Sequence, residues 1–156
     1  MPSFAEIANK KASTIEKPPL PPVGNYVMMI IDNPQVQKRS SDKGEFEIID
    51  VSFQGVQALD DVDTAELKKF GGAKGVRVRK SFIFNTAPDG EAAFQREEWN
   101  LRNFLVDHLK LDANKSLMEL LGMCKGCQCQ VEVGLRPDTR NPENFFADVK
   151  STMPLG

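Results

Sequence analysis

Basic side chains that could bind phosphate groups recur in three separate segments of this sequence. In the run from Val76 to Asn85, Arg77 and Arg79 alternate with apolar residues, and Lys80 follows directly. Lysine and arginine bind a nucleic-acid backbone by neutralising phosphates and releasing counterions. The full set of candidates is Lys38, Arg39, Lys43, Arg77, Arg79, Lys80, Arg136 and Arg140. These residues predict a phosphate-binding surface if the fold brings their three segments together.

Aromatic side chains close to these segments could stack on bases. One stacked ring is worth about 1–3 kcal/mol, but the ring must be exposed. The candidates are Tyr26, Phe46 and Phe82. The alternative for each is burial in the core, because large apolar side chains are usually buried. A bulge at Lys80, where a basic residue interrupts the apolar positions of its strand, would bring Phe82 to the surface.

The cysteines and the single histidine are the residues that could bind a metal. Cys124 and Cys127 form a C-x-x-C pair, Cys129 follows, and His108 lies upstream. A structural zinc site normally shows two well-spaced pairs of ligands, and this chain has one pair. We therefore expect buried structural thiols, no metal and no cofactor. His108 is expected in the last turn of a helix, where a histidine suits the helix dipole.

The sequence contains none of three common catalytic motifs. The phosphate-binding G-x-x-x-x-G-K, the nucleophile motif G-x-S-x-G and the zinc motif H-E-x-x-H do not occur. Acidic residues gather at Asp60, Asp61 and Asp63 and again at Glu97 and Glu98, where solvation of a loop or a helix surface explains them. We therefore expect a binding protein and no catalytic residues.

Size and composition favour one globular domain. A chain of 156 residues with 40% hydrophobic residues can bury a core. The net charge of −2 gives no overall attraction to nucleic acid, so the positions of the charges matter more than their sum. The apolar run at residues 26–31 is too short to cross a bilayer, no signal peptide precedes it, and the three cysteines fit a reducing compartment. We expect a cytoplasmic protein, in the host cytoplasm if it is viral, with no membrane partner.

The hydrophobic pattern predicts a flexible, proline-rich arm over residues 1–23 and one domain over residues 24–156. Strands are expected at residues 25–32, 45–55, 75–85, 126–136 and 144–150. Residues 34–44 read as a loop, and residues 57–74 as a connection that contains a helical turn capped by Asp63. A long amphipathic helix of roughly 30 Å is expected after Pro88-Asp89-Gly90, with apolar residues from Phe94 to Leu109. A shorter helix should begin at the capping box of Ser116 and end at Gly122.

Three strands, a helix and two further strands form the element order of the OB-fold. The predicted fold class is thus β-rich, a five-stranded Greek-key barrel with a helix between strands three and four. This fold binds oligonucleotides on strands two and three and on the loops joining strands one to two and four to five. The three basic segments fall at these places. We expect sequence-tolerant binding of single-stranded DNA, with RNA as the alternative ligand.

A different class of function remains open beside nucleic-acid binding. The same barrel could serve as a virion component or a protein-interaction module, with residues 1–23 as its docking segment. That hypothesis agrees with the mild net acidity of the chain.

Short motifs along the chain resemble small bacteriophage single-stranded DNA-binding proteins. They are the entry Pro22–Tyr26, the polar segment 38–44, the strand end Phe82–Asn85, the helix through Leu101 and Phe104, and Leu120-Leu121-Gly122 ahead of residues 129–133. The resemblance covers roughly residues 20–150. It implies an OB-fold that coats single strands in phage DNA replication and recombination and that needs no cofactor. Separately from the resemblance, the chain could form homo-oligomers. Replication or recombination proteins would be its partners.

One feature departs from that family. Many of its members end in an acidic tail that recruits partner enzymes, whereas this chain ends in Lys150 and six uncharged residues. The arm at residues 1–23 is then the candidate for recruiting partners.

Overall fold

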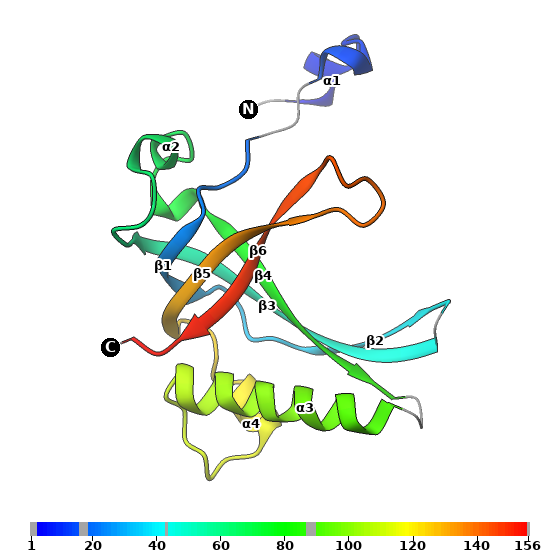
Figure 1. Cartoon of the computed structure of the whole chain (residues 1–156), viewed down its shortest axis with the longest axis vertical. Coiled ribbons are helices and arrows are strands. Elements are labelled where there is room, and N and C mark those ends of the chain that lie inside the picture. Colours follow the sequence, from blue (N-terminus) through cyan, green and yellow to red (C-terminus); the bar gives the residue numbers. More distant parts are fainter. Residues whose placement is uncertain (1–2, 16–18, 43, 87–89, 156) are drawn as a thin grey trace.

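A six-stranded antiparallel sheet organises the described part of the chain, and helices lie at its ends (Figure 1). The computed structural model describes residues 3–15, 19–42, 44–86 and 90–155. The strands are β1 (Gly24–Ile30), β2 (Val36–Ser41), β3 (Gly44–Ala58), β4 (Arg77–Asn85), β5 (Gln128–Pro137) and β6 (Phe145–Met153). The helices are α1 (Phe4–Ile7), α2 (Thr64–Lys68), α3 (Glu91–Arg102) and α4 (Leu117–Leu121), with shorter turns η1 (Ala12–Thr14), η2 (Ala73–Gly75) and the π-helical η4 (Asn103–His108).

The long strand β3 connects the two parts of the sheet. One of its edges pairs with β4 in an unbroken register from Phe46 opposite Asn85 to Gln54 opposite Arg77. Its other edge pairs first with β2 and then, near its end, with β1. β1 continues the sheet to β5, and β5 to β6. β1 and β2 therefore follow one another along the same edge of β3.

The prediction of a loop over residues 34–44 is wrong, because Val36–Ser41 forms strand β2. All six residues of β2 are exposed, so the strand has no buried face. A strand is recognised in a sequence by its apolar alternation, and this segment has none. Its pairing with β3 supplies the backbone hydrogen bonds that hold it in place.

The sheet is not closed. β4 and β6 lie next to each other, yet no ladder of backbone pairs joins them among the described residues. A hollow occupies the space between their outer surfaces. The sheet thus has two neighbouring edges where the predicted barrel has a closing pair.

The hydrophobic core lies between the inner surface of the sheet and the segment formed by α3 and η4, which crosses one end of the sheet (Figure 1). Ile49, Val51 and Phe53 face this core, as their alternation in the sequence predicts. The ring of Phe104 packs 6.0 Å from that of Phe53 and 5.6 Å from that of Phe82, between ring centroids. Burying each large apolar side chain stabilises the fold by about 1.5–3 kcal/mol, so this contact anchors the helix to the sheet.

Both helix caps expected from the sequence are present. A side-chain oxygen of Asp63 accepts hydrogen bonds from the backbone N–H groups of Ala65 and Glu66, at 2.9 and 3.2 Å. The hydroxyl of Ser116 accepts one from the N–H of Glu119 at 3.2 Å, and Gly122 is the C-cap of α4. The long helix begins at Glu91, directly after Gly90 as predicted, and continues as η4 to His108.

Residues 3–15 are exposed throughout and carry α1 and η1 at the N-terminal end of the described chain (Figure 1). The arm-and-domain division after residue 23 stays a prediction, although β1 does begin at Gly24. No helix within the described ranges has the length and apolar character needed to span a bilayer.

Candidate nucleic-acid interface

The surface of β2, β3 and β4 that faces away from the core carries several of the predicted basic residues. In β4, Arg77, Arg79, Ser81 and Ile83 are exposed, whereas Val78, Phe82 and Phe84 on the opposite parity are buried. The neighbouring strands place Phe46, Ile48 and Asp50 of β3 and Gln37 and Arg39 of β2 on the same surface. We call this surface the outward face; its members are Gln37, Arg39, Phe46, Ile48, Asp50, Ser52, Gln54, Arg77, Arg79, Ser81 and Ile83.

A groove of ≈ 630 Å³ runs between the outward face and β6. From the outward face it is lined by Ile48, Arg79 and Ser81, with Ile83 and the neighbouring Lys80. From the other side it is lined by Arg136 of β5 and by residues 146–149 of β6. This β4–β6 groove therefore brings together two of the three basic segments, which are more than fifty residues apart in the chain.

Arg136 and Phe146 form the outer wall of the β4–β6 groove. The Nε of Arg136 lies 3.2 Å from Oδ2 of Asp148, and its guanidinium carbon is 5.9 Å from the centroid of the Phe146 ring. The Phe146 residue is 44% exposed. An aromatic ring and a cation thus stand side by side at the edge of the groove, and the aromatic residue is partly exposed to solvent.

Arg39 brings the third basic segment to the outward face. It lies on β2 opposite Phe46, and its NH2 nitrogen donates to Oε1 of Gln37 at 2.9 Å. The same nitrogen is 3.8 Å from Oδ2 of Asp50. A chain of polar contacts therefore runs from β2 across β3 to β4, where the Ser81 hydroxyl donates to Asp50 at 2.5 Å.

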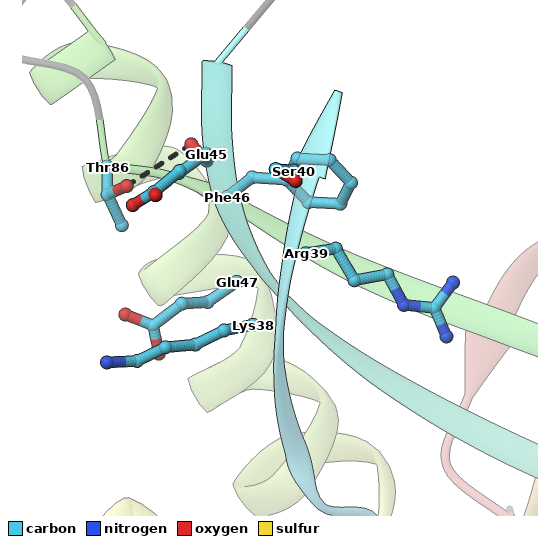
Figure 2. A pocket seen from close by; sticks show the side chains of 7 residues that line it. All are labelled: Lys38, Arg39, Ser40, Glu45, Phe46, Glu47 and Thr86. Atoms are coloured by element: carbon cyan, nitrogen blue, oxygen red, sulfur yellow. Dashed lines mark hydrogen bonds between the residues drawn. The ribbon is translucent and has the colours of Figure 1, made fainter. Parts of the chain in front are cut away.

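A second hollow of ≈ 420 Å³ surrounds Phe46 near the tip of β2 and β3 (Figure 2). Thr86 closes one side of it, and its hydroxyl donates to the carbonyl oxygen of Glu45 at 3.2 Å. Figure 2 shows Arg39 and Lys38 extending to opposite sides of β2, with Lys38 beside Glu47. Lys38 therefore does not share the outward face with Arg39, although the two adjacent residues were predicted to bind phosphates together.

Arg77 and Arg140 do not line the groove, Lys80 lines it from the inner parity of β4, and one further candidate lies outside the described residues. Arg77 is exposed at the far end of β4, opposite Gln54. Arg140 is exposed in the turn between β5 and β6, where its N–H donates to Asp138. Lys43 lies outside the described residues. The prediction of a bulge at Lys80 is wrong, because β3 and β4 stay in register there. Lys80 shares the parity of Phe82 on β4, is half-buried and lines the groove, and its Nζ stands 5.0 Å from the centroid of the Phe82 ring.

Tyr26 and Phe82 are core residues, so the prediction that they stack on bases is wrong for this structure. Both are fully buried. The hydroxyl of Tyr26 donates to the carbonyl oxygen of Pro22 at 2.6 Å, and burial, with the nearby carboxylate of Asp61, raises the pKa of Tyr26 to about 12. Phe46 is only half-buried. Of the three predicted stacking residues it alone presents its ring at the surface.

Two exposed residues of the groove, Phe146 and Ile83, were not among the residues predicted from the sequence. Ile83 occupies the same parity of its strand as Arg77 and Arg79, and that parity is the signal that could have identified it. The sequence pattern that could have identified Phe146 is weaker. It follows Phe145, and two consecutive phenylalanines in one strand must face opposite sides of the sheet.

The cysteines occupy the positions expected of structural thiols. Cys124 and Cys129 are buried, and burial raises the pKa of each to about 12, with a smaller contribution from Cys127. Cys127 is half-buried, burial raises its pKa as well, and its thiol donates to the carbonyl oxygen of Met123 at 3.3 Å. A thiol with a raised pKa is a poor nucleophile at neutral pH.

His108 lies in the last turn of η4, as predicted. Its Nδ1 is 2.7 Å from the hydroxyl oxygen of Thr152 on β6. Burial lowers the pKa of His108 from its usual value. The residue thus ties the helix to the sheet as a neutral imidazole.

No protein-family model matches this chain, and a comparison with curated proteins gives no match either.

Proposed function

We propose that this chain binds single-stranded DNA along the outward face and the β4–β6 groove, largely without regard to sequence. One observation carries the proposal. Arg39, Arg79 and Arg136 come from three distant segments and lie around one continuous surface. Exposed or half-buried apolar side chains, Phe46, Ile83 and Phe146, lie among them.

This combination of side chains suits a single strand better than a duplex. Arginines would neutralise phosphates, and each base stacked on an aromatic ring would add about 1–3 kcal/mol. In a duplex the faces of the bases are stacked on one another, so the rings of Phe46 and Phe146 would have no partner. A single strand offers phosphates and base faces together.

The proposed fold is an OB-fold-like barrel opened between its last pair of strands. If β1 and β2 are counted as one interrupted strand, the order becomes three strands, a helix and two strands. β4 and β6 would then be the pair that closes the barrel. The outward face would be the surface of strands two and three, where this fold binds oligonucleotides.

The proposed biological role is to protect and organise single strands during DNA replication and recombination, in a bacteriophage if the resemblance reflects descent. Replication or recombination proteins would then be the protein partners. RNA is the alternative ligand, because folds of this kind bind both nucleic acids.

Fluorescence anisotropy with a labelled thymidine oligomer of about 15 nucleotides tests the proposal, a length that covers the site of one OB-fold. Affinity should fall steeply as the salt concentration rises. The variants Arg79→Glu and Arg136→Glu should each weaken binding at least tenfold, by about 1.4 kcal/mol. Lys115→Glu makes the same charge change on an exposed loop beyond η4 and serves as the control.

Two outcomes would contradict the proposal. One is the absence of binding at low salt. The other is an equal loss in Lys115→Glu and Arg79→Glu, since that would reflect overall charge and no defined site. A uridine oligomer and a duplex of equal length, measured in parallel, distinguish DNA from RNA and single strands from double strands.

A protein-docking role for the N-terminal segment is the second candidate, supported by a separate observation. Phe4, Ile7 and Ile15 are 78%, 44% and 59% exposed, beside Lys10 and Lys11. Exposed apolar side chains clustered in a short segment are typical of a segment that binds a partner. Failure to bind any oligomer, together with recovery of the protein in purified virus particles, would favour this role over the first.

A further inference from the structure

A polar hollow of ≈ 230 Å³ opens on the outward face at the point where β1 gives way to β2. Apart from one proline its lining side chains all carry hydrogen-bonding groups: Asp32, Asn33, Gln35, Gln37, Asp50 and Ser52. We call it the Asp50 hollow. It lies on the path between Arg39 and Arg79, because Asp50 is close to Arg39 and Ser52 pairs with Arg79 across the sheet.

The charge of this hollow is opposite to what a phosphate requires. Asp32 and Asp50 both line it, and a carboxylate repels the backbone of a nucleic acid. Asp50 is held in place, since its carboxylate accepts the hydroxyl of Ser81 at 2.5 Å and its side chain is 17% exposed. Its other oxygen lies 3.8 Å from the guanidinium of Arg39, and the carboxylate still has acceptor positions for hydrogen bonds donated by a ligand.

The bases of a single strand differ in the donors on their exposed edges. A carboxylate is an acceptor only, with room for about four hydrogen bonds on its two oxygens. Guanine offers two adjacent donors, N1–H and the 2-amino group, and beside them the acceptor O6. Thymine offers one donor between two carbonyl acceptors, and those acceptors would face the carboxylate. Adenine and cytosine each offer one amino donor next to an acceptor nitrogen.

The hollow also contains a donor for the third atom of the guanine edge. The Oε1 of Gln37 accepts from Arg39, which leaves the amide NH₂ of the same side chain to donate. The two carboxylate oxygens of Asp50 could accept from N1–H and the 2-amino group of guanine, while the amide NH₂ of Gln37 donates to O6. The volume is below the roughly 300–1,000 Å³ of ordinary small-molecule sites, which suits one planar edge.

We propose that the Asp50 hollow reads one base of the bound strand and prefers guanine, with Asp50 as the specificity-determining residue. This inference rests on the proposed function, since it assigns a base preference to one position of the same surface. Elsewhere along the outward face the bases would be held by stacking and by their phosphates, which every sequence provides.

The test uses the full chain and four oligomers that differ in one central base: an all-thymidine strand and the same strand with a single guanine, cytosine or inosine. EDTA in the buffer removes any contribution from a bridging cation. The guanine oligomer should bind about tenfold more tightly than the all-thymidine oligomer, as expected of a bidentate base contact. Inosine lacks the 2-amino group, so the affinity of the inosine oligomer should lie between those of the guanine and the all-thymidine oligomers. This comparison uses the parent chain alone and needs no protein variant.

Two protein variants separate base reading from simple electrostatics. Asp50→Asn should reduce the guanine preference to below about twofold, because an amide offers one acceptor atom where the carboxylate offers two. Asp148→Asn removes the same charge at the wall of the β4–β6 groove and should strengthen binding of all four oligomers equally. Gln37→Glu should weaken binding of the guanine oligomer by placing a carboxylate against O6.

The outcomes distinguish this inference from the proposed function. If no oligomer binds, the proposed function is wrong and the inference with it. If all four oligomers bind with equal affinity, or if Asp50→Asn keeps the full guanine preference, single-strand binding stands and base reading by the Asp50 hollow is overturned.

Discussion

Oδ2 of Asp148 lies 3.2 Å from Nε of Arg136, across the pair of strands that forms the outer wall of the β4–β6 groove. The two side chains are 38% and 63% exposed. An ion pair this open to solvent contributes about 0–1 kcal/mol to stability. Its main effect is therefore on the availability of Arg136: while the carboxylate holds the guanidinium, less of the positive charge is available to a phosphate.

The variant Asp148→Asn should bind a thymidine oligomer several-fold more tightly than the parent chain. Arg136 would gain a phosphate contact, so the plot of log affinity against log salt should steepen by about 0.7. Anisotropy titrations at several salt concentrations measure both quantities, and thermal unfolding should show little change. Weaker binding by Asp148→Asn would mean that the carboxylate positions Arg136 for the ligand instead of competing with it.

Phe146→Ala should weaken single-strand binding by about 1–3 kcal/mol, the usual value of one stacked base. Stability should change little, because the ring is 44% exposed. Phe145→Ala is the matched control: Phe145 is 41% exposed, it adjoins Phe146 on the same strand, and it does not line the groove. Equal losses in both variants, measured by anisotropy, would exclude stacking in the groove.

The elements that bury one side could be predicted from the sequence. Ile49, Val51 and Phe53 alternate in β3, and burial of this row follows from the two-residue period of a strand. The caps at Asp63 and Ser116 were predictable for a similar reason, since the contact that defines a cap spans only two or three residues.

The elements without a buried side could not be predicted. β2 is exposed at every position, so only its pairing with β3 identifies it as a strand. The open edge between β4 and β6 is likewise a property of the tertiary structure. No local pattern states whether two distant strands exchange backbone hydrogen bonds.

The candidate site was predictable in part. The parity of β4 predicts that Arg77 and Arg79 share a face, and the structure agrees. The distance between side chains on β4 and on β5–β6 depends on the path of the whole chain, which the sequence pattern does not contain. Lys38 and Arg39 point to opposite sides because successive side chains of a strand alternate (Figure 2). The prediction of a loop at this segment gave no reason to expect that separation.

Tyr26→Phe should destabilise the fold by about 1–2 kcal/mol, because it leaves the buried carbonyl oxygen of Pro22 without its partner. Urea unfolding followed by circular dichroism measures this loss. Tyr26 is the only tyrosine in the chain, so an absorbance titration reports its pKa, which should be about 12 in the folded protein. Ionisation near the ordinary value of 10.0 would show that the ring is accessible and would reopen a stacking role.

His108 should make the folded protein less stable as the solution becomes mildly acidic. Burial lowers its pKa below the usual 6.5; Lys80 and Lys110 act in the same direction, and Asp107 opposes them. Between the folded and the unfolded pKa the unfolded chain binds more protons, so stability increases with pH there. The contribution of neutral His108 to stability should be complete above about pH 6.5 and decline as the pH falls from 6.5 towards the folded pKa.

The melting temperature should therefore decrease as the pH falls below about 6.5, and His108→Gln should flatten that decrease. Asp61 affects the stability of the fold at lower pH than His108 does. Hydrogen bonds from Asn25 lower the pKa of its carboxyl below 3.8, so its contribution is lost only as the pH falls below that value, through the folded pKa. An NMR titration of the single histidine gives the folded pKa of His108 directly. A value of 6.5 would abolish the linkage and a higher value would reverse its sign; either would contradict the neutral, hydrogen-bonded imidazole that joins η4 to β6.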